Sequence, residues 1–206
     1  MPELPEVEVV KQSLEKKIKF QKIHKVLVGN RNLRFKIPKN FEFFLKNKKI
    51  IKIGRKSKYL IFYLNKNSFF IMHLGMSGTI HISKKNNDIN TNTSFYGSSN
   101  LPKKHNHILI FFKKYRFVYN DPRRFGFVKI LNNKKDLESF FNKIGPEPLN
   151  YQFKKSYICD YLKNKEKNIK DFLLDQKFVS GIGNIYASEI LFASKINPFK
   201  KAKRLS

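Results

Sequence analysis

The chain has few cysteines and few acidic residues, and both shortages narrow its chemistry. Cys159 is the single cysteine among 206 residues, which excludes a disulfide within the chain and a zinc site built from several cysteines. Only 15 acidic residues accompany 43 lysines and arginines, which gives a formal net charge of +28. Such an excess of positive charge points first to a polyanionic partner, and nucleic acid is the default expectation.

Long apolar runs are also missing. None approaches the roughly 18 residues of a membrane span, and the first residues lack the basic and apolar regions of a secretory signal. We therefore expect a cytoplasmic protein with no membrane partner. Apolar residues still make up 41% of the sequence and aromatic residues 15%, which is enough for one or two folded cores.

The N-terminus concentrates carboxylates in an otherwise basic chain. Four of the 15 acids lie among the first 15 residues: Glu3, Glu6, Glu8 and Glu15. If Met1 is removed, Pro2 becomes a free secondary amine, which can attack the C1′ carbon of a deoxyribose as its base leaves. An α-amino group has a pKa of about 7.7 to 8.0, and the neighbouring Glu3 is close enough to act as acid or base. The alternative is that Pro5 merely opens a helix whose positive end favours acidic neighbours.

Hydrophobic periodicity divides the chain into two regions. Apolar residues recur at helical spacing from Val7 to Ile18, which predicts a helix over about residues 5–17. Short β-type runs then indicate a β-sandwich or barrel: 22–28, 49–53, 59–64, 69–74, 79–82, 107–112, 116–119 and 127–131. Residues 84–100 are rich in Asn, Ser, Thr and Lys and predict a mobile loop between two strands.

From Lys134 onward the pattern becomes helical. Gly145-Pro146-Glu147-Pro148 interrupts the chain, and helical segments follow at about 153–165, 168–175 and 184–194. We expect an α+β fold of two domains: an N-terminal β-sandwich with an N-terminal helix over residues 1–132, and a helical domain over residues 133–206.

Two predicted turns carry side chains suited to the interior of a DNA duplex. Residues 73–78 place Met76 at the tip of a tight turn, where it could enter a base stack, although methionine usually fills a core. Residues 120–126 form a second turn, in which Phe125 would insert beside a base and Arg123 would contact an orphaned base. An ordinary hairpin with a solvated basic tip is the alternative for this second turn.

Other segments are candidates for phosphate contacts. Lys58 ends a basic cluster before an apolar strand and could contact a phosphate or move a proton, or it could be one more solvated lysine. His105 and His107 are predicted to share one strand face, which is a weak metal signal; phosphate contact by His105, or a surface strand end, is the alternative. Residues 181–184 precede a helix whose N–H groups suit a phosphate. They lack the context and glycine spacing of a dinucleotide site.

Five segments together resemble the bacterial formamidopyrimidine-DNA glycosylases, in the family's order along nearly the whole chain: 2–8, 73–78, 121–126, 145–149 and 183–189. The resemblance implies an enzyme that excises oxidised purines, such as 8-oxoguanine and formamidopyrimidines, from double-stranded DNA and then cuts the strand at the abasic site. It also implies a β-sandwich joined to a helix-two-turn-helix domain, with DNA in the cleft between them. We expect a monomer.

The resemblance further implies a role for each candidate residue. Pro2 would form the Schiff base, Glu3 would act as acid or base at the sugar, and Glu6 matches a structural and catalytic carboxylate. Lys58 matches a lysine that contacts phosphate and assists β-elimination. Six residues would contact DNA, the first three filling the gap left by an extruded nucleotide and the last three gripping the backbone: Met76, Arg123, Phe125, His105, Lys165 and Asn184.

The sequence departs from the family at its C-terminal end. Family members continue into a zinc finger with paired Cys-x-x-Cys ligands and an arginine that contacts DNA, whereas this sequence ends at Ser206. We therefore expect no cofactor within the chain and weaker DNA binding, since each phosphate contact adds to counterion release. A catalytically silent relative that only binds damaged or bent DNA is the alternative function. A general nucleic-acid binder, for instance of RNA, is a third hypothesis.

Overall fold

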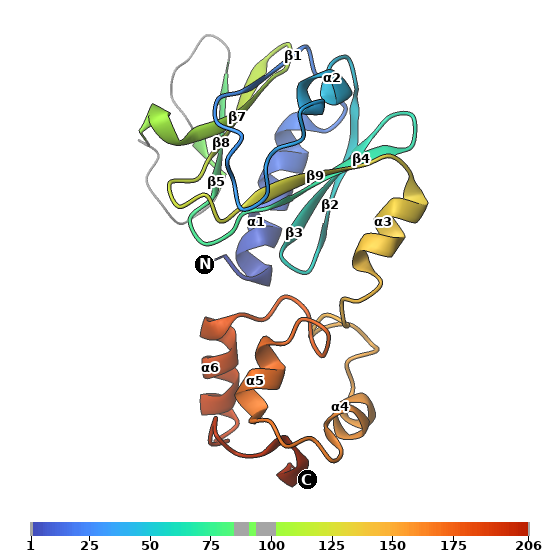
Figure 1. Cartoon of the computed structure of the whole chain (residues 1–206), viewed down its shortest axis with the longest axis vertical. Coiled ribbons are helices and arrows are strands. Elements are labelled where there is room, and N and C mark those ends of the chain that lie inside the picture. Colours follow the sequence, from blue (N-terminus) through green and yellow to red (C-terminus); the bar gives the residue numbers. More distant parts are fainter. Residues whose placement is uncertain (1, 85–90, 94–101, 206) are drawn as a thin grey trace. The chain divides into compact units, whose positions relative to one another are not determined.

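The computed structural model describes residues 2–84, 91–93 and 102–205 (Figure 1). The chain divides into two compact units, Met1–Ser139 and Phe140–Ser206. The first unit contains two α-helices, one 3-10 helix and nine strands within the described residues: α1 (Leu4–Ile18), β1 (Lys25–Val28), α2 (Phe41–Leu45), β2 (Ile50–Lys56), β3 (Tyr59–Leu64), β4 (Ser68–His73), β5 (Thr79–Lys84), β6 (Thr91–Asn92), η1 (Lys103–His105), β7 (Asn106–Phe111), β8 (Tyr115–Asn120) and β9 (Phe127–Leu131). Helix α3 (Lys134–Phe141) spans the boundary between the units.

Two antiparallel sheets form the first unit. Among the described residues, one sheet has the strand order β2-β3-β4-β9 and the other the order β1-β7-β8-β5-β6. A single apolar cluster draws buried side chains from both sheets and from α1, so the sheets face each other as a sandwich. The predicted α+β class, with its N-terminal helix, is confirmed.

Helix α1 follows directly from its sequence. Val7, Val10, Leu14 and Ile18 recur on one face and are all fully buried, as the periodicity predicts. Its start is fixed by a capping box, in which the Glu3 side chain accepts from the Glu6 N–H and the Glu6 carboxylate accepts from the Glu3 N–H. The buried face of α1 packs against β2 and β3.

Two connections between the sheets lie side by side. Strand β4 leads into β5 and β8 leads into β9, and each pair links one sheet to the other. Because His73 is paired with Phe127, and Thr79 with Asn120, the two connecting turns begin and end at matching positions. The fold therefore brings residues 74–78 against residues 121–126, although 40 or more positions separate them in the sequence.

Glycine makes the contact between these turns possible. Gly75 adopts φ +66°, and a Cβ there would lie 2.4 Å from the Gly126 nitrogen. A Cβ on Gly126 would lie 1.8 Å from the Tyr119 Oη and 2.7 Å from the His73 carbonyl oxygen. Neither position has room for a side chain, so the two turns approach each other through their backbones.

His105 does not share a strand face with His107, although the strand predicted at 107–112 is present as β7. His105 ends η1, because its N–H bonds back to the Pro102 carbonyl at 3.1 Å, and β7 begins at Asn106. The predicted shared strand face is therefore wrong, whereas His107 does lie on β7. The short helix α2 was not predicted. The predicted loop at 84–100 falls mostly outside the described residues, of which Thr91 and Asn92 form β6.

The second unit is helical and has its own core. It contains α4 (Lys155–Leu162), α5 (Ile169–Leu174), α6 (Asn184–Ala193) and the 3-10 helix η2 (Ala202–Arg204). The buried ring of Phe178 stacks on Tyr157 at 5.9 Å between centroids and lies 4.8 Å from Tyr161. Ser180 donates its N–H to the Pro146 carbonyl oxygen at 2.8 Å, which ties the Gly-Pro-Glu-Pro segment to the turn before α6.

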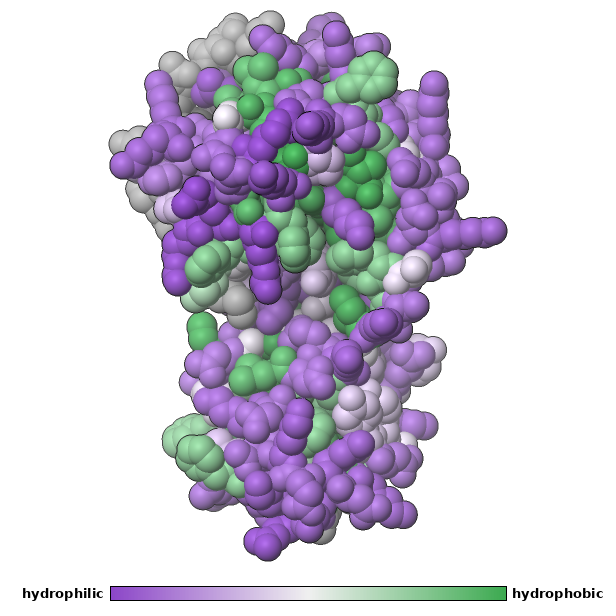
Figure 2. Space-filling model, viewed as in Figure 1, coloured by the Kyte–Doolittle hydropathy of each residue, from purple (hydrophilic) through white to green (hydrophobic). Residues whose placement is uncertain are grey.

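Hydrophilic residues cover most of the visible face of the molecule (Figure 2). This is consistent with a sequence in which 28% of the residues are charged. None of the helices in the described ranges is long and apolar enough to span a membrane.

Replacing Gly126 with alanine should destabilise the first unit. The new Cβ would collide with the Tyr119 hydroxyl and the His73 carbonyl oxygen, so we expect a loss of at least about 2 kcal/mol in the free energy of unfolding. Urea unfolding measures the change. Gly54→Ala is the control, because the three atoms nearest to its Cβ all belong to the Tyr63 side chain and none to the backbone. Equal losses in the two variants would contradict the prediction.

Candidate functional site

Pro2 and Glu3 lie buried at the start of α1. Glu3 is only 1% exposed, and its backbone N–H donates to Oε2 of Glu6 at 2.8 Å. The reciprocal bond to the Glu3 side chain closes the capping box. Glu6 therefore fixes the backbone that carries Pro2 and Glu3, which is the arrangement that a preorganised site requires.

Lys58 occupies the turn between β2 and β3 beside the N-terminus. Ser57 adopts φ +55° in this turn, and Lys58 is only 8% exposed. Burial lowers the pKa of the Lys58 ammonium, and the nearby charge of Glu3 opposes that shift. Lys58 and Glu3 therefore come close enough to interact, although 55 positions separate them in the sequence.

An ion pair ties this turn to helix α1. Arg55 Nε donates to Glu8 Oε2 at 2.8 Å, and Arg55 Nη1 donates to the Ser57 carbonyl oxygen at 2.9 Å. Although partial burial raises the pKa of Glu8, the bonds from Arg55 and Gln12 and the nearby positive charges leave that pKa below its ordinary value. Through Arg55, the helix that presents Glu3 and the turn that presents Lys58 are connected.

Met76, Arg123 and Phe125 come together at one pocket. Each projects from one of the two adjoining turns, and Met76 and Phe125 are both 42% exposed. The Arg123 guanidinium carbon lies 4.9 Å from the centre of the Phe125 ring, within cation–π range. The pocket has a volume of about 740 Å³ and is lined by these three residues together with Asn32, Leu33, Arg34, His73, Gly75 and Arg124.

Two ionisable residues of this pocket were not singled out as site residues from the sequence: His73, which opens the segment 73–78, and Arg34. The His73 ring stacks on Phe127 at 5.6 Å, and its Nδ1 accepts the Gly75 N–H at 3.1 Å. Burial, followed by the positive charges of Lys58 and Arg34, lowers the pKa of His73 to about 4. His73 is therefore neutral at pH 7, with its proton on Nε2 as a donor.

Arg34 reaches the same pocket from the segment between β1 and α2. Its backbone N–H donates to the Gly126 carbonyl oxygen at 3.1 Å, and the residue is exposed. Together with Arg123 and Arg124 it places three arginines on the pocket wall. The basic side chain was not singled out because nothing near it in the sequence distinguishes it from the many other cations.

The other residues predicted to contact DNA do not line this pocket. His105 is half-buried at the end of η1, where its carbonyl oxygen accepts the Asp121 N–H at 3.1 Å. In the second unit, Lys165 is exposed after α4, and Asn184 is exposed as the first residue of α6. Both present polar side chains to solvent.

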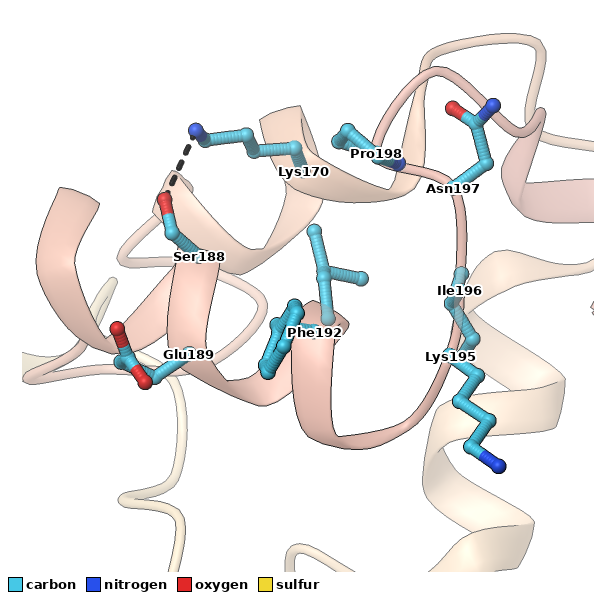
Figure 3. Close-up of a pocket in the computed structure, with 9 residues that line it drawn as sticks. Lys170, Ser188, Glu189, Phe192, Lys195, Ile196, Asn197 and Pro198 are labelled. Carbon is cyan, nitrogen blue, oxygen red and sulfur yellow. Dashed lines mark hydrogen bonds between the residues drawn. The ribbon is translucent and has the colours of Figure 1, made fainter.

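A separate cavity of about 620 Å³ lies in the second unit, along α6 (Figure 3). Lys170 Nζ donates to Ser188 Oγ at 3.1 Å on its wall. Lys165 and Asn184 do not line this cavity, and neither does any other residue predicted for the functional site. Within the described part of the chain, no group of three or more histidine, cysteine, aspartate or glutamate side chains is placed to hold a metal ion.

Sequence profiles of known families match both units. The profile of the formamidopyrimidine-DNA glycosylase N-terminal domain matches residues 1–128, and the profile of the helix-two-turn-helix domain of the same enzymes matches residues 144–206. The chain belongs to the formamidopyrimidine-DNA glycosylase family. The resemblance inferred from the sequence motifs is confirmed.

Individual members of the family show how much of their length is shared. The formamidopyrimidine-DNA glycosylase of Wolbachia from Drosophila simulans is 42% identical over 207 residues, and that of Bartonella tribocorum is 39% identical over 212 residues. In both comparisons all of this chain is covered, together with 71% of the relative.

Solved structures of the Lactococcus lactis formamidopyrimidine-DNA glycosylase share the fold. Its complex with DNA containing an abasic site matches at a TM-score of 0.85 and 33% identity, covering 99% of this chain and 71% of that one. Its complex with DNA containing an oxidised pyrimidine matches at 0.86 and 33% identity, covering 100% and 73%. The family is thus one of DNA glycosylases, and these Lactococcus lactis structures contain damaged DNA.

The partly buried His73 should make this family member less stable in acid. Its pKa of about 4 in the folded state lies below the ordinary value of 6.5, so the unfolded chain binds more protons between those values. The contribution of neutral His73 to the free energy of unfolding is complete above about pH 6.5, and it is lost as the pH falls toward about 4. A neutral His73→Gln variant lacks this dependence.

We expect the stability advantage of the native chain over His73→Gln to shrink by about 2 kcal/mol between about pH 7.5 and about pH 4.5. Urea titrations at several pH values measure it, with the exposed His24→Gln as the control. A difference between native chain and His73→Gln that stays constant with pH would contradict the assignment.

Proposed function

We propose that this chain excises oxidised purines from double-stranded DNA and cuts the strand at the abasic site that results. The observation that carries the proposal is the fixed Pro2-Glu3 start of α1, beside the buried Lys58. An amine, a carboxylate and a second amine of lowered pKa meet there, and these are the groups that Schiff-base chemistry needs. Family membership supports the same activity.

Pro2 acts as the nucleophile once Met1 has been removed. Its nitrogen forms a bond to C1′ of the deoxyribose, and the bond from C1′ to the base breaks, so that the electron pair leaves with the base. Opening of the sugar ring and loss of the proton on nitrogen give an iminium ion. This cation accepts electrons when a proton leaves C2′, and the bond from C3′ to the phosphate oxygen then breaks.

The buried groups around Pro2 move the protons. Glu3 exchanges a proton with the sugar as the ring opens, and Glu6 fixes the backbone of Glu3 through its capping bond. Lys58 binds the adjacent phosphate and assists the elimination. A lowered pKa suits Lys58 to this second role, because a larger fraction of its amine is neutral near pH 7.

The pocket residues open the duplex. The glycosidic carbon cannot be reached inside a base stack, so the damaged nucleotide must leave the helix at a cost of a few kcal/mol. Met76 and Phe125 enter the space that it vacates, and Arg123 hydrogen-bonds the orphaned base. We refer to Met76, Arg123 and Phe125 as the wedge. Their exposure beside a shared pocket supports this role.

Backbone contacts complete the binding of DNA. His105, Lys165 and Asn184 grip phosphates, the last of these at the N-terminus of a helix of ten residues. The net charge of +28 adds attraction that does not depend on sequence. We infer a monomer that acts on chromosomal DNA in the bacterial cytoplasm and needs no cofactor for this chemistry.

Borohydride trapping on a duplex with one abasic site tests the proposed nucleophile. The native chain should form a covalent adduct that peptide mass spectrometry assigns to Pro2. In Pro2→Gly the ring that restricts the amine is lost, so we expect at least about tenfold less adduct and strand cleavage.

Pro5→Gly is the matched control, because it makes the same substitution three positions later and leaves the terminal amine intact. It should keep most of the adduct. An adduct on a lysine, unchanged cleavage by Pro2→Gly, or no adduct from native protein that begins at Pro2 would overturn the proposal, and the last outcome would leave binding of damaged DNA as the activity.

Arg34 should contribute one phosphate contact that the sequence did not predict. Removing one contact lowers the slope of log K against log salt by about 0.9, so Arg34→Ala should show that reduction on duplex DNA. Fluorescence anisotropy titrations at several salt concentrations measure the slope. The control is Lys39→Ala, an exposed cation near Arg34 that does not line the pocket, and an equal change in both variants would refute a specific contact.

A further inference from the structure

The wedge depends on a hydrogen-bond network that joins its two turns. Met76 lies on the β4–β5 connection, whereas Arg123 and Phe125 lie on the β8–β9 connection. No backbone ladder runs between the tips themselves, because strand pairing stops at His73 with Phe127 on one side and at Thr79 with Asn120 on the other. The spacing of the tips must therefore be set by other contacts.

A buried carboxylate supplies those contacts. Asp121 is fully buried, and its Oδ1 accepts from Ser77 Oγ at 2.5 Å. Its Oδ2 accepts from the Gly126 N–H at 2.8 Å and from the Tyr119 hydroxyl at 3.1 Å. One side chain thus bonds to the turn of Met76, to the end of the turn of Phe125 and to strand β8.

Ser77 closes the network next to the wedge itself. It neighbours Met76 in the sequence, and its Oγ accepts the backbone N–H of Arg123 at 3.2 Å while donating to Asp121. The hydroxyl therefore connects the backbones on which two of the wedge side chains are mounted. A serine at this position acts as a bridge, although it is only partly buried.

Steric contacts remove the remaining freedom beneath the tips. The Tyr119 hydroxyl that donates to Asp121 also fills the space where a Cβ of Gly126 or of Gly78 would lie. Gly75 meets the Phe125–Gly126 backbone in the same way. Hydrogen bonds and close packing thus act on the same two turns, and a shift of one turn requires a shift of the other.

We propose that Ser77 and Asp121 are positioning residues that mount Met76, Arg123 and Phe125 as one rigid unit for insertion into duplex DNA. The inference rests on the proposed wedge function and explains why the wedge can insert. Because the turns are already ordered in the folded protein, the entropy of ordering their tips is lost on folding and not on binding to DNA. A positioning role predicts a defect on duplex DNA alone, since a single strand has no stack to enter.

The test is Ser77→Ala, which breaks the bridge while leaving the Asp121 contacts to Tyr119 and Gly126 intact. The probe is a duplex with a tetrahydrofuran abasic analogue opposite 2-aminopurine, whose fluorescence rises when the base is unstacked. At saturating protein we expect the rise for Ser77→Ala to be about one third of the native rise or less, and the duplex affinity to fall about tenfold. Affinity for the same lesion in a single strand should change less than about twofold.

Ser68→Ala is the matched control. Ser68 lies at the opposite end of β4. Its hydroxyl accepts from Lys48 Nζ and donates to the Asn65 carbonyl oxygen, so Ser68→Ala also removes a bridging hydroxyl, but far from the wedge. It should behave as the native chain does. Asp121→Asn should also keep most of the fluorescence rise, because its amide oxygen can accept from Gly126 and Tyr119 while its NH₂ donates to Ser77.

Equal losses on duplex and single strand, or no loss in Ser77→Ala, would overturn the positioning role. Met76→Ala tests the wedge directly: a native-like fluorescence rise in that variant would overturn both the wedge and this inference. Because the probe resists cleavage, the result is independent of Pro2. A native chain that unstacks 2-aminopurine yet forms no borohydride adduct would disprove the proposed chemistry while leaving the positioning role supported.

Discussion

Buried carboxylates organise the candidate site of a chain whose net charge is +28. Burial of a carboxylate is costly unless hydrogen-bond donors replace its hydration. Asp121 meets this condition with donors from two turns and a strand, and Glu3 meets it within a capping box. Because the acids need their donors in place, the backbone segments that supply those donors are fixed as well.

Periodicity was sufficient to predict the elements whose own sequence determines them. Helix α1 appears in the spacing from Val7 to Ile18, and β3 and β9 have the predicted limits because each is a short apolar run that ends at turn residues. The five residues of α2 were missed, since a helix so short shows no period. His105 was assigned to a strand because alternation with His107 cannot reveal that its N–H bonds back to Pro102.

The site was predictable only where a motif marks it. Pro2, Glu3, Met76, Arg123 and Phe125 stand in distinctive segments, and the fold brings the last three to one pocket; their roles stay predictions. His73 stands in the marked segment 73–78 but was not singled out there, because its surroundings arise from strand pairing with Phe127. Arg34 lies in none of the marked segments, and its backbone contact with Gly126 comes from a loop. Local patterns in a sequence do not predict the register in which strands far apart in the chain will pair.

The distribution of charge separates general attraction to DNA from recognition of damage. Most of the 43 lysines and arginines can contribute only through counterion release, which makes binding stronger at low salt without choosing a site. The side chains that we propose for the wedge and for catalysis are few, and specific contacts hold their backbones. The Arg123 N–H donates to Ser77 Oγ, and Lys58 lies in the turn that Arg55 ties to α1. Extrusion of a nucleotide costs free energy. General electrostatic attraction to phosphates cannot offset this cost, since that attraction is the same whether the base is stacked or extruded. Selectivity must therefore come from the side chains whose positions the fold has fixed.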